Sequence, residues 1–260
     1  MDTPHLIAWL KPVAALGCLV GLWTWETWFP LVTANSNRYR HARRNLFVAV
    51  LNTIVLNVLF GASLVAVAAW TTEARLGLLN LLEYPWYFEF AFAVLLLDLW
   101  MYCWHRLNHR FPLLWRFHRM HHSDRQMDVT TATRFHLGEH LGATAAKFCL
   151  IPFWGVNLTQ IVFYETLVVM ITMLHHANVS LGVLDDCLRW VIVTPRMHQT
   201  HHSRIRAECD ANYSVTFSFW DRIGNSYKVR PGNEPLELGL SEFEGDSSQT
   251  ISGMLKTPFV

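Results

Sequence analysis

Histidine is the residue type whose distribution most directly suggests chemistry. The chain has 14 histidines, and twelve of them lie between His105 and His202. Neutral imidazoles are ligands for iron, copper, nickel and zinc. None of the five cysteines falls within the histidine clusters, and the sequence has neither a CxxC pair nor an HExxH motif. These absences argue against a zinc finger, an iron–sulfur site and a zincin protease. The sequence therefore predicts a metal site built from nitrogen ligands.

The first cluster pairs His105 with His109 in HxxxH spacing. On a helix, residues four apart lie on the same face, so the two imidazoles can bind one metal ion. Asp98 lies seven residues before His105 on that face. An acidic residue in a membrane helix needs a partner, and the second N–H of a metal-bound imidazole is a natural one. Taken alone, HxxxH is equally compatible with a polar helix end.

The motif HxxHH occurs twice, and each copy is followed by a serine. Its histidines are His118, His121, His122, His198, His201 and His202. Neighbouring helical residues point about 100° apart, so the two adjacent histidines of a copy do not easily hold the same ion. They can do so if two ions lie side by side or if the helix ends there. With HxxxH, the motifs supply eight histidines, which is four for each of two metals.

Four apolar stretches precede or separate these motifs. Hydrophobic residues make up 52% of the chain and charged residues 16%, against about 25% charged in ordinary soluble domains. The stretches cover about residues 6–31, 47–70, 86–104 and 141–174. The second is uncharged and, at about 1.5 Å per residue, long enough to cross a hydrocarbon core of about 30 Å. The fourth is interrupted by Pro152, Gly155 and Asn157, which predicts a helical hairpin.

Positive charge predicts the orientation of these helices. Arg38, Arg40, Arg43 and Arg44 precede the second apolar stretch, and a loop rich in arginine faces the cytoplasm. Counting crossings from there brings residues 105–140 and 176–260 to the cytoplasmic side. A topology derived without reference to histidine thus places all twelve clustered histidines at one membrane face.

Three further expectations concern charge and the C-terminus. The net charge of +1 provides no field for binding nucleic acid. Arg116, Arg119 and Arg125 flank the second cluster as interfacial charges or, alternatively, as a site for a lipid headgroup or an acidic redox partner. One domain is expected over residues 1–230. The segment 231–260 is polar with little periodicity, which predicts a loosely ordered cytoplasmic tail.

Further motifs follow in a fixed order between about residues 90 and 230. They are Arg134-x-His136-x-x-Glu139, His176-Ala-Asn178, Thr194-Pro195-Arg196-Met197-His198, Asn212-Tyr213 and Trp220-Asp221-Arg222. Together with HxxxH and the two HxxHH motifs, this order resembles the fatty acid hydroxylase/sterol desaturase superfamily, and the bacterial-type sterol desaturase branch within it.

The resemblance implies an all-α integral membrane bundle of about four transmembrane helices or hairpins, with a cytoplasmic helical cap that holds a dimetal site. It implies two iron ions, with zinc as a substitute, and O2-dependent hydroxylation or desaturation of a C–H bond in a sterol, fatty acyl or related lipid. The metal ligands implied by matching positions are His105, His109, His118, His121, His122, His136, His176, His198, His201 and His202. Asp98, Glu139 and Asn178 are expected to assist catalysis. His140 and His175 fall outside the pattern.

No electron-carrier domain is recognisable, so electrons are expected from a separate ferredoxin, cytochrome b5 or reductase. The expected location is a bacterial inner membrane. A metal transporter is an alternative, although it needs ligands near the middle of the bilayer. A non-catalytic, zinc-bound relative is another, because imidazole ligands for iron and zinc look alike in a sequence.

Overall fold

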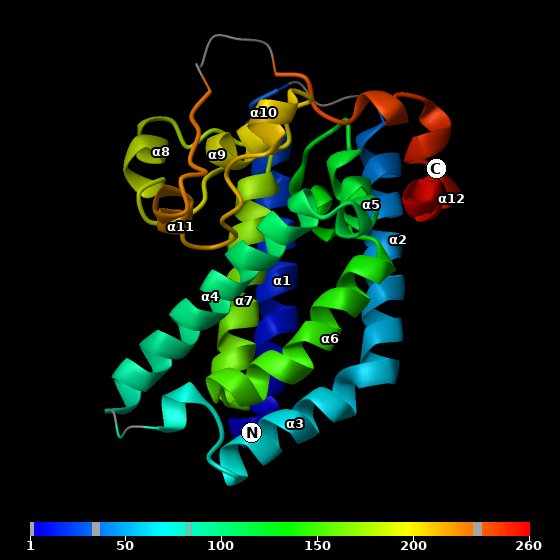
Figure 1. Cartoon of the computed structure of the whole chain (residues 1–260). Coiled ribbons are helices and arrows are strands. Elements are labelled where there is room, and N and C mark those ends of the chain that lie inside the picture. Colours follow the sequence, from blue (N-terminus) through cyan, green and yellow to red (C-terminus); the bar gives the residue numbers. More distant parts are fainter. Residues whose placement is uncertain (1–2, 33–36, 82, 84, 231–235) are drawn as a thin grey trace.

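The computed structural model describes residues 3–32, 37–81, 83, 85–230 and 236–260, and they form an all-helical fold (Figure 1). Within these ranges the only strand-like pairings are two isolated bridges, Ile192 with Phe217 and Ser203 with Leu238. The predicted all-α class is therefore confirmed.

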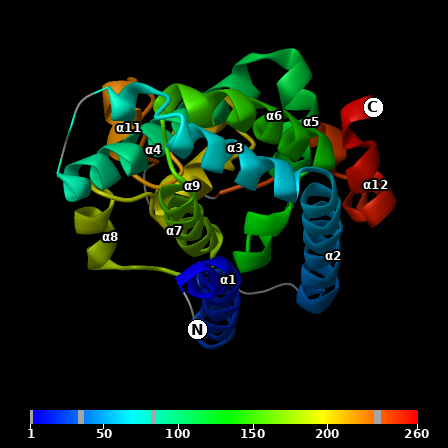
Figure 2. The ribbon, with the colours of Figure 1, turned by 90° about the horizontal axis from the view of Figure 1, so that it is seen from below.

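Long helices form the lower part of the molecule. They are α1 (Thr3–Trp28), α2 (Arg38–Leu56), α3 (Ala62–Glu73), α4 (Trp86–Arg110), α6 (Leu137–Trp154) and α7 (Leu158–His176). A π-helical turn, η1 (Asn57–Gly61), joins α2 directly to α3. Seen from below, α3 crosses beneath the bundle from α2 toward α4, and the short η2 (Leu78–Asn80) follows it (Figure 2).

Three helical segments in the described part of the chain are long and apolar enough to cross a membrane. They are Arg38–Asn80, Trp86–Arg110 and Leu158–His176. Their exposed surfaces are rich in large apolar side chains such as Phe47, Val58 and Phe92, as helices surrounded by lipid require. The predicted count of about four spans remains a prediction.

The hairpin between α6 and α7 is present where the sequence places its break. Gly155 ends α6 in the left-handed conformation, with φ of 82°. A Cβ atom there would lie 2.5 Å from the Leu76 carbonyl oxygen, so glycine also permits close packing against the end of α3. Asn157 then caps α7 by accepting a hydrogen bond from the Gln160 amide at 3.0 Å.

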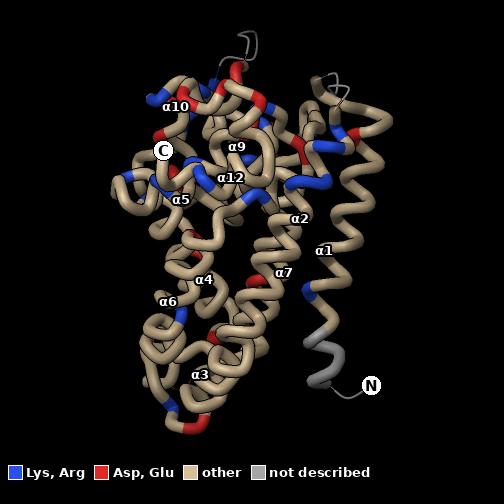
Figure 3. The backbone as a smooth tube through the Cα atoms, turned by 90° about the vertical axis from the view of Figure 1, so that its right-hand side faces the viewer, with Lys and Arg blue, Asp and Glu red and all other residues tan. Residues whose placement is uncertain are grey.

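A cap of short helices covers the upper end of the bundle. It contains α5 (Pro112–His122), η3 (Val129–Thr133), α8 (Val183–Leu188), α9 (Pro195–His201), α10 (Arg206–Cys209) and α11 (Phe219–Ile223). Charged residues are concentrated in this cap, whereas the helical half below carries few of them (Figure 3). This distribution is that of a membrane bundle with one large polar end.

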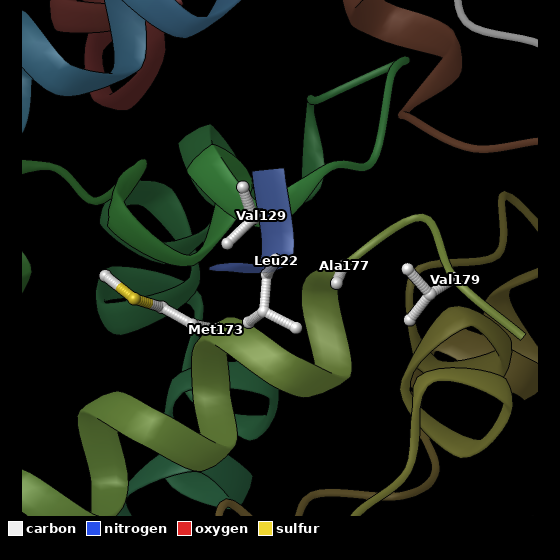
Figure 4. Packing of buried hydrophobic residues seen from close by; sticks show 5 residues of the cluster. All are labelled: Leu22, Val129, Met173, Ala177 and Val179. Atoms are coloured by element: carbon white, nitrogen blue, oxygen red, sulfur yellow. The ribbon is translucent and has the colours of Figure 1, made fainter. Parts of the chain in front are cut away.

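A buried apolar cluster ties the first helix to the cap. Leu22 of α1 packs with Met173 and Ala177 at the end of α7, with Val129 of η3, and with Val179 beyond α7 (Figure 4). Because these side chains come from four separate segments, the cluster fixes the end of α7, where the predicted ligand His176 lies, against the rest of the cap.

The prediction of a loosely ordered tail is wrong for residues 236–260; residues 231–235 lie outside the described residues. Beyond residue 240 the tail forms η4 (Ser241–Phe243), η5 (Asp246–Gln249), α12 (Ile251–Lys256) and η6 (Thr257–Phe259). Met254 is fully buried against Val48 of α2 and Met120 of α5. Met254, with Ile251 packed beside it, attaches this segment to α2 and α5. Two such residues are too few to produce a periodic pattern in the sequence.

The arginines that flank the second histidine cluster hold this tail. Arg116 donates to the Pro258 carbonyl at 2.7 Å, Arg119 to the Thr257 carbonyl at 2.6 Å, and Arg125 to the Asp246 carboxylate at 2.6 Å. The structure therefore gives these arginines a role in attaching the tail, and the predicted interfacial, headgroup or redox-partner roles stay predictions.

Replacing Met254 with alanine should destabilise the protein. The lost burial and the remaining cavity are expected to lower the free energy of unfolding by about 2–5 kcal/mol. Thermal denaturation in detergent measures this as a lower midpoint. Phe259→Ala is the matched control, because Phe259 is 72% exposed and its loss should change little. Equal midpoints for Met254→Ala and the wild type would contradict the packed tail.

Candidate metal centre

Two consecutive helices bring the first five histidines together. Phe111 ends α4 and Pro112 begins α5, because proline is unfavourable within a helix and suited to its first turn. The chain therefore starts a new helix here, and α5 packs against α4. The rings of His105 and His109 on α4 lie 4.9 and 5.0 Å from the ring of His118 on α5.

The remaining histidines come from the end of α7 and from α9. The rings of His176 and His198 lie 4.3 Å apart, and the ring of His201 lies 4.5 Å from that of His105. Both HxxHH motifs stand at the ends of their helices, followed by Ser123 and Ser203. The predicted convergence of the three clusters at one end of the bundle is confirmed.

The imidazoles form two groups suited to two metal ions. In each group one nitrogen from every ring lies within 4.8 Å of the others. The first group contains His105, His109, His118, His122 and His201, and the second contains His121, His176, His198 and His202. Each adjacent pair of histidines is divided between the groups, as the angle between neighbouring helical side chains predicts.

In the first group, hydrogen bonds at Nδ1 direct Nε2 inward. His105 and His201 donate from Nδ1 to the carbonyl oxygens of Tyr213 and Ala211, at 2.8 and 2.6 Å. A carbonyl oxygen only accepts, so both rings carry their proton on Nδ1 and present a lone pair at Nε2. Both Nε2 atoms are buried without a hydrogen-bond partner. A metal ion would supply the missing partner of each Nε2 atom, so these residues fit the implied dimetal centre.

In the second group, the ring nitrogens approach one another closely. His176 Nε2 lies 3.1 Å from His121 Nε2 and 3.0 Å from His198 Nε2, while its Nδ1 donates to the Thr172 carbonyl at 2.7 Å. Ligands about 2.1 Å from a common ion are separated by about 3 Å when the angle between them is near 90°. The spacing therefore also fits a bound cation.

Burial favours the neutral form of the three histidines of the second HxxHH motif. It lowers the pKa of His198, His201 and His202 well below its ordinary value, and neighbouring imidazoles lower the pKa further. Only a neutral imidazole has a lone pair to offer a metal. The site is thus prepared for metal binding near neutral pH.

Glu139 supports a histidine of the first group. Its Oε1 lies 2.9 Å from His118 Nδ1 and accepts a hydrogen bond from Asn108 at 3.1 Å. A carboxylate in this position orients the imidazole and makes it a stronger ligand. The structure places Glu139 beside the metal group and not within it.

Replacing Glu139 with glutamine should weaken metal binding without breaking the fold. Loss of such a supporting hydrogen bond costs about 10–100-fold in metal affinity or activity. Titration against a chelator measures the effect, and His140→Ala is the control because His140 belongs to neither group. Unchanged chelator resistance in the glutamine variant would contradict the supporting role.

Histidines 136 and 175 occupy different surroundings from the nine grouped ones. The structure places His136 outside both groups: it caps α6 by accepting from the Gly138 amide at 3.0 Å, and its Nε2 faces the Leu255 carbonyl at 3.3 Å. Both of its nitrogens have these other partners, so the structure does not bring His136 into either group. His175 is outside the groups, as expected, but its ring lies 3.9 Å from that of His198.

Asp98 and Asn178 form hydrogen bonds with residues outside the two histidine groups. Asp98 accepts hydrogen bonds from the Tyr164 hydroxyl, the Phe217 amide and the Trp220 indole, at 2.7, 3.0 and 2.9 Å. Asn178 donates to the Val32 carbonyl at 2.7 Å, which ties the end of α1 to the end of α7. Neither contact involves a grouped histidine, so the predicted pairing of Asp98 with a metal-bound imidazole is wrong.

A turn at residues 211–214 supports the site and is not apparent from ligand spacing. Asp221 accepts hydrogen bonds from the amides of Tyr213 and Ser214 at 2.7 and 3.0 Å. Asn212 has a positive φ of 54° and donates to the Met197 carbonyl at 3.0 Å. These contacts aim the carbonyls of Ala211 and Tyr213 at two ligands. The Asn-Tyr and Trp-Asp motifs were the available signal for this turn.

The chain is similar to proteins named for lipid hydroxylation and to one protein family. The family model "Fatty acid hydroxylase" matches residues 90–226, which include all nine grouped histidines. The ornithine lipid hydroxylase OlsE of Rhizobium tropici is 28% identical over 68% of this chain and 52% of its own length. Alkylglycerol monooxygenases of Xenopus tropicalis and Homo sapiens are 27% and 28% identical, over 62% and 60% of this chain.

The matched region is only part of these relatives. It spans 52% of the rhizobial protein and 35% and 34% of the two monooxygenases. No solved structure is detectably similar. Because the family model covers more than half of the chain and contains both histidine groups, the chain belongs to the fatty acid hydroxylase family.

Proposed function

We propose that the chain is a membrane oxidoreductase that hydroxylates an aliphatic C–H bond of a lipid with two iron ions and O2. The observation that carries the proposal is the pair of buried histidine groups at the end of apolar helices. The relatives are named for hydroxylation and monooxygenation, so hydroxylation is favoured over desaturation.

The nine grouped histidines would hold the two ions. When bound, redox-active metals supply the activation of O2 that breaking an unactivated C–H bond requires, and side-chain acids and bases cannot supply it. Insertion of one oxygen atom reduces the other to water, which consumes two electrons and two protons. The chain would receive these electrons from a separate donor such as a ferredoxin, a cytochrome b5 or a reductase.

The surrounding residues position the ligands and exclude water. His121, His176, His198 and His201 are each at most 2% exposed, so an oxidising species would form away from bulk solvent. The carbonyls of Ala211 and Tyr213 and the Glu139 carboxylate fix the orientation of three rings. Such fixed ligands need little reorganisation during the reaction.

The arrangement supports a lipid substrate drawn from the bilayer. The grouped histidines lie where α4 and α7 end, so a lipid chain that entered between the helices would approach them from the membrane. We place this end on the cytoplasmic side of a bacterial inner membrane, on the strength of the arginines between residues 38 and 44. A transporter is disfavoured, because its ligands would lie near the middle of the spans.

Expression in a heterologous host followed by lipid mass spectrometry tests the proposal. A lipid that gains the mass of one oxygen atom is expected with the wild type and should disappear with His201→Ala. The control variant, His140→Ala, should keep the product. Loss of two hydrogens would indicate desaturation instead. Two tightly bound zinc ions and no modified lipid, even with a reductant and iron supplied, would identify a non-catalytic relative.

A further inference from the structure

Large apolar side chains are exposed on one side of the cap. They belong to α8, to the residues after it and to α11, and we call them the α8–α11 patch. The patch comprises Val183, Leu184, Trp190, Val191 and Ile223, which are 83%, 60%, 63%, 56% and 73% exposed. Single exposed apolar residues are ordinary, but a contiguous group on a polar cap marks an interaction surface.

Hydrogen bonds connect the two parts of this patch. The Val193 amide donates to the Thr216 carbonyl at 3.0 Å, and Arg222 of α11 donates to the Arg189 carbonyl at 2.9 Å. The Ser218 hydroxyl donates to the same carbonyl at 2.7 Å. The patch is therefore one surface and not two unrelated loops.

The segment that carries α11 lies alongside a candidate membrane span. The Phe217 amide and the Trp220 indole bond to Asp98, and the Ser226 hydroxyl lies 2.9 Å from the Tyr102 hydroxyl. Asp98 precedes the end of α4 at Arg110 by twelve residues, or about 18 Å along the helix axis. Figures 1 and 2 both show α8 and α11 on the side of the molecule where α4 runs. The patch thus extends down toward the level of the bilayer.

A small cationic pocket lies behind the patch. Its lining includes Arg189, Arg196, Lys228 and Arg230, with Asp185 as the acidic member. Its volume of about 10 Å³ holds about one water molecule, so a larger anion would contact the basic side chains from outside. Arg189 and Arg230 form ion pairs with Asp186 and Glu208, at 2.6 and 2.7 Å, whereas Arg196 and Lys228 are exposed. Met197 and Thr200 of α9 form another part of the wall, so the pocket touches the helix that carries the grouped His198 and His201.

This combination is that of a surface resting in a membrane interface. Tryptophan and aliphatic residues enter the boundary between headgroups and acyl chains, and arginine and lysine remain at the level of the phosphates. Arg222 likewise combines a positive charge with aromatic contacts. Its guanidinium lies 4.4 Å from the centre of the Trp190 ring and 4.0 Å from that of Tyr227.

We propose that the α8–α11 patch enters the bilayer leaflet beside α4 and that Arg196 and Lys228, the two exposed basic side chains at the pocket, contact the anionic headgroup of a lipid in that leaflet. The ligand chemistry is a phosphate or carboxylate attached to acyl chains. The surface is a second membrane contact, separate from the spans, and does not depend on the chemistry proposed for the metal centre.

Spin labelling tests the immersion of the patch. A nitroxide is attached to Leu184→Cys in full-length protein whose exposed Cys149 and Cys187 are changed to serine, and the protein is placed in phosphatidylcholine–phosphatidylglycerol nanodiscs. The label is expected to be relaxed more by O2 than by water-soluble chromium oxalate. A label at Glu242→Cys, an exposed position of the tail, should show the reverse. Equal access of chromium oxalate to both labels would overturn the proposal, as would shielding of position 184 from both reagents, which indicates a protein partner or a second copy.

Lipid retention tests the pocket. The double variant Arg196→Ala, Lys228→Ala is solubilised from phosphatidylglycerol-containing membranes, and the bound lipid is counted by native mass spectrometry. Retained phosphatidylglycerol should fall on the order of 10-fold. The matched control is Arg40→Ala, Arg43→Ala, which removes two exposed arginines from α2 and should retain the lipid. Free inorganic phosphate that competes fully with the lipid would show a simple anion site, and an equal loss in both variants would show nonspecific attraction; either result overturns the headgroup site.

Discussion

His201→Ala and His202→Ala are expected to remove metal from different halves of the centre, although the two residues are neighbours in the chain. His201 belongs to the group of five histidines and His202 to the group of four. The wild type should carry two metal ions per chain. His202→Ala leaves three ligands in its group and should lose close to one ion. His201→Ala leaves four ligands and should weaken binding of the other ion.

Both variants should lose nearly all activity, because the reaction needs both ions. Loss of a supporting residue alone costs about 10–100-fold, so loss of a ligand should cost at least about 100-fold. Metal content is measured by plasma mass spectrometry on purified protein, and the remaining affinity by competition with a chelator. The asymmetry between the variants is the informative result, since a general folding defect would lower both ions equally.

His136→Ala is the matched control for these variants. It removes a histidine from the same cap, but His136 caps α6 and faces the tail, so two ions should remain. Full metal occupancy in both His201→Ala and His202→Ala would refute the two-group centre. Loss of an ion from His136→Ala would restore the ligand role that the motif comparison implied.

The division of the adjacent histidines could be predicted because it depends only on local helix geometry. Side chains of neighbouring helical residues diverge by about 100°, whichever tertiary structure follows. The hairpin break at Gly155 and Asn157 was predictable for the same reason, since it rests on backbone conformations that these residues favour. Local rules therefore located the ligands and the helices that carry them.

The partners of the polar residues depended on tertiary contacts and were not predictable. Asp98 lies on the same helical face as His105, but seven residues separate them by about 10 Å along the axis. That distance is too long for a hydrogen bond. The Phe217 amide and the Trp220 indole donate to Asp98 instead. The order of the tail was unpredictable for the same reason. Met254 packs against Val48 of α2 and Met120 of α5, and no sequence pattern near residue 254 indicates this contact.

Asp98→Ala should produce the largest loss of stability among the variants considered. Asp98 is fully buried, and its carboxylate accepts three hydrogen bonds from two different parts of the chain. Alanine would leave these donors without an acceptor, and each unpaired buried group costs about 1–3 kcal/mol. The expected result is a loss of about 3 kcal/mol or more, measured by chemical denaturation in detergent, together with loss of metal.

The metal is lost because Asp98 anchors the segment that supports the ligands. Trp220 and Phe217 hold that segment on α4, and Asp221 within it fixes the carbonyls that face His105 and His201. Release of the anchor therefore disorders the carbonyls without touching a ligand. Metal content should fall in parallel with stability, and supplying the metal in excess should recover part of both.

Two further variants separate the hydrogen bonds from the side-chain volume. Asp98→Asn keeps one oxygen for the Phe217 amide and the Trp220 indole, and its amide can donate to the Tyr164 hydroxyl, so most of the stability should return. Tyr164→Phe removes one donor at a cost of about 1 kcal/mol. Combined with Asp98→Ala it should add much less than that, because its partner is already absent, and this shortfall is the coupling energy. Strict additivity of the two changes would mean that Asp98 stabilises the protein by some route other than these hydrogen bonds.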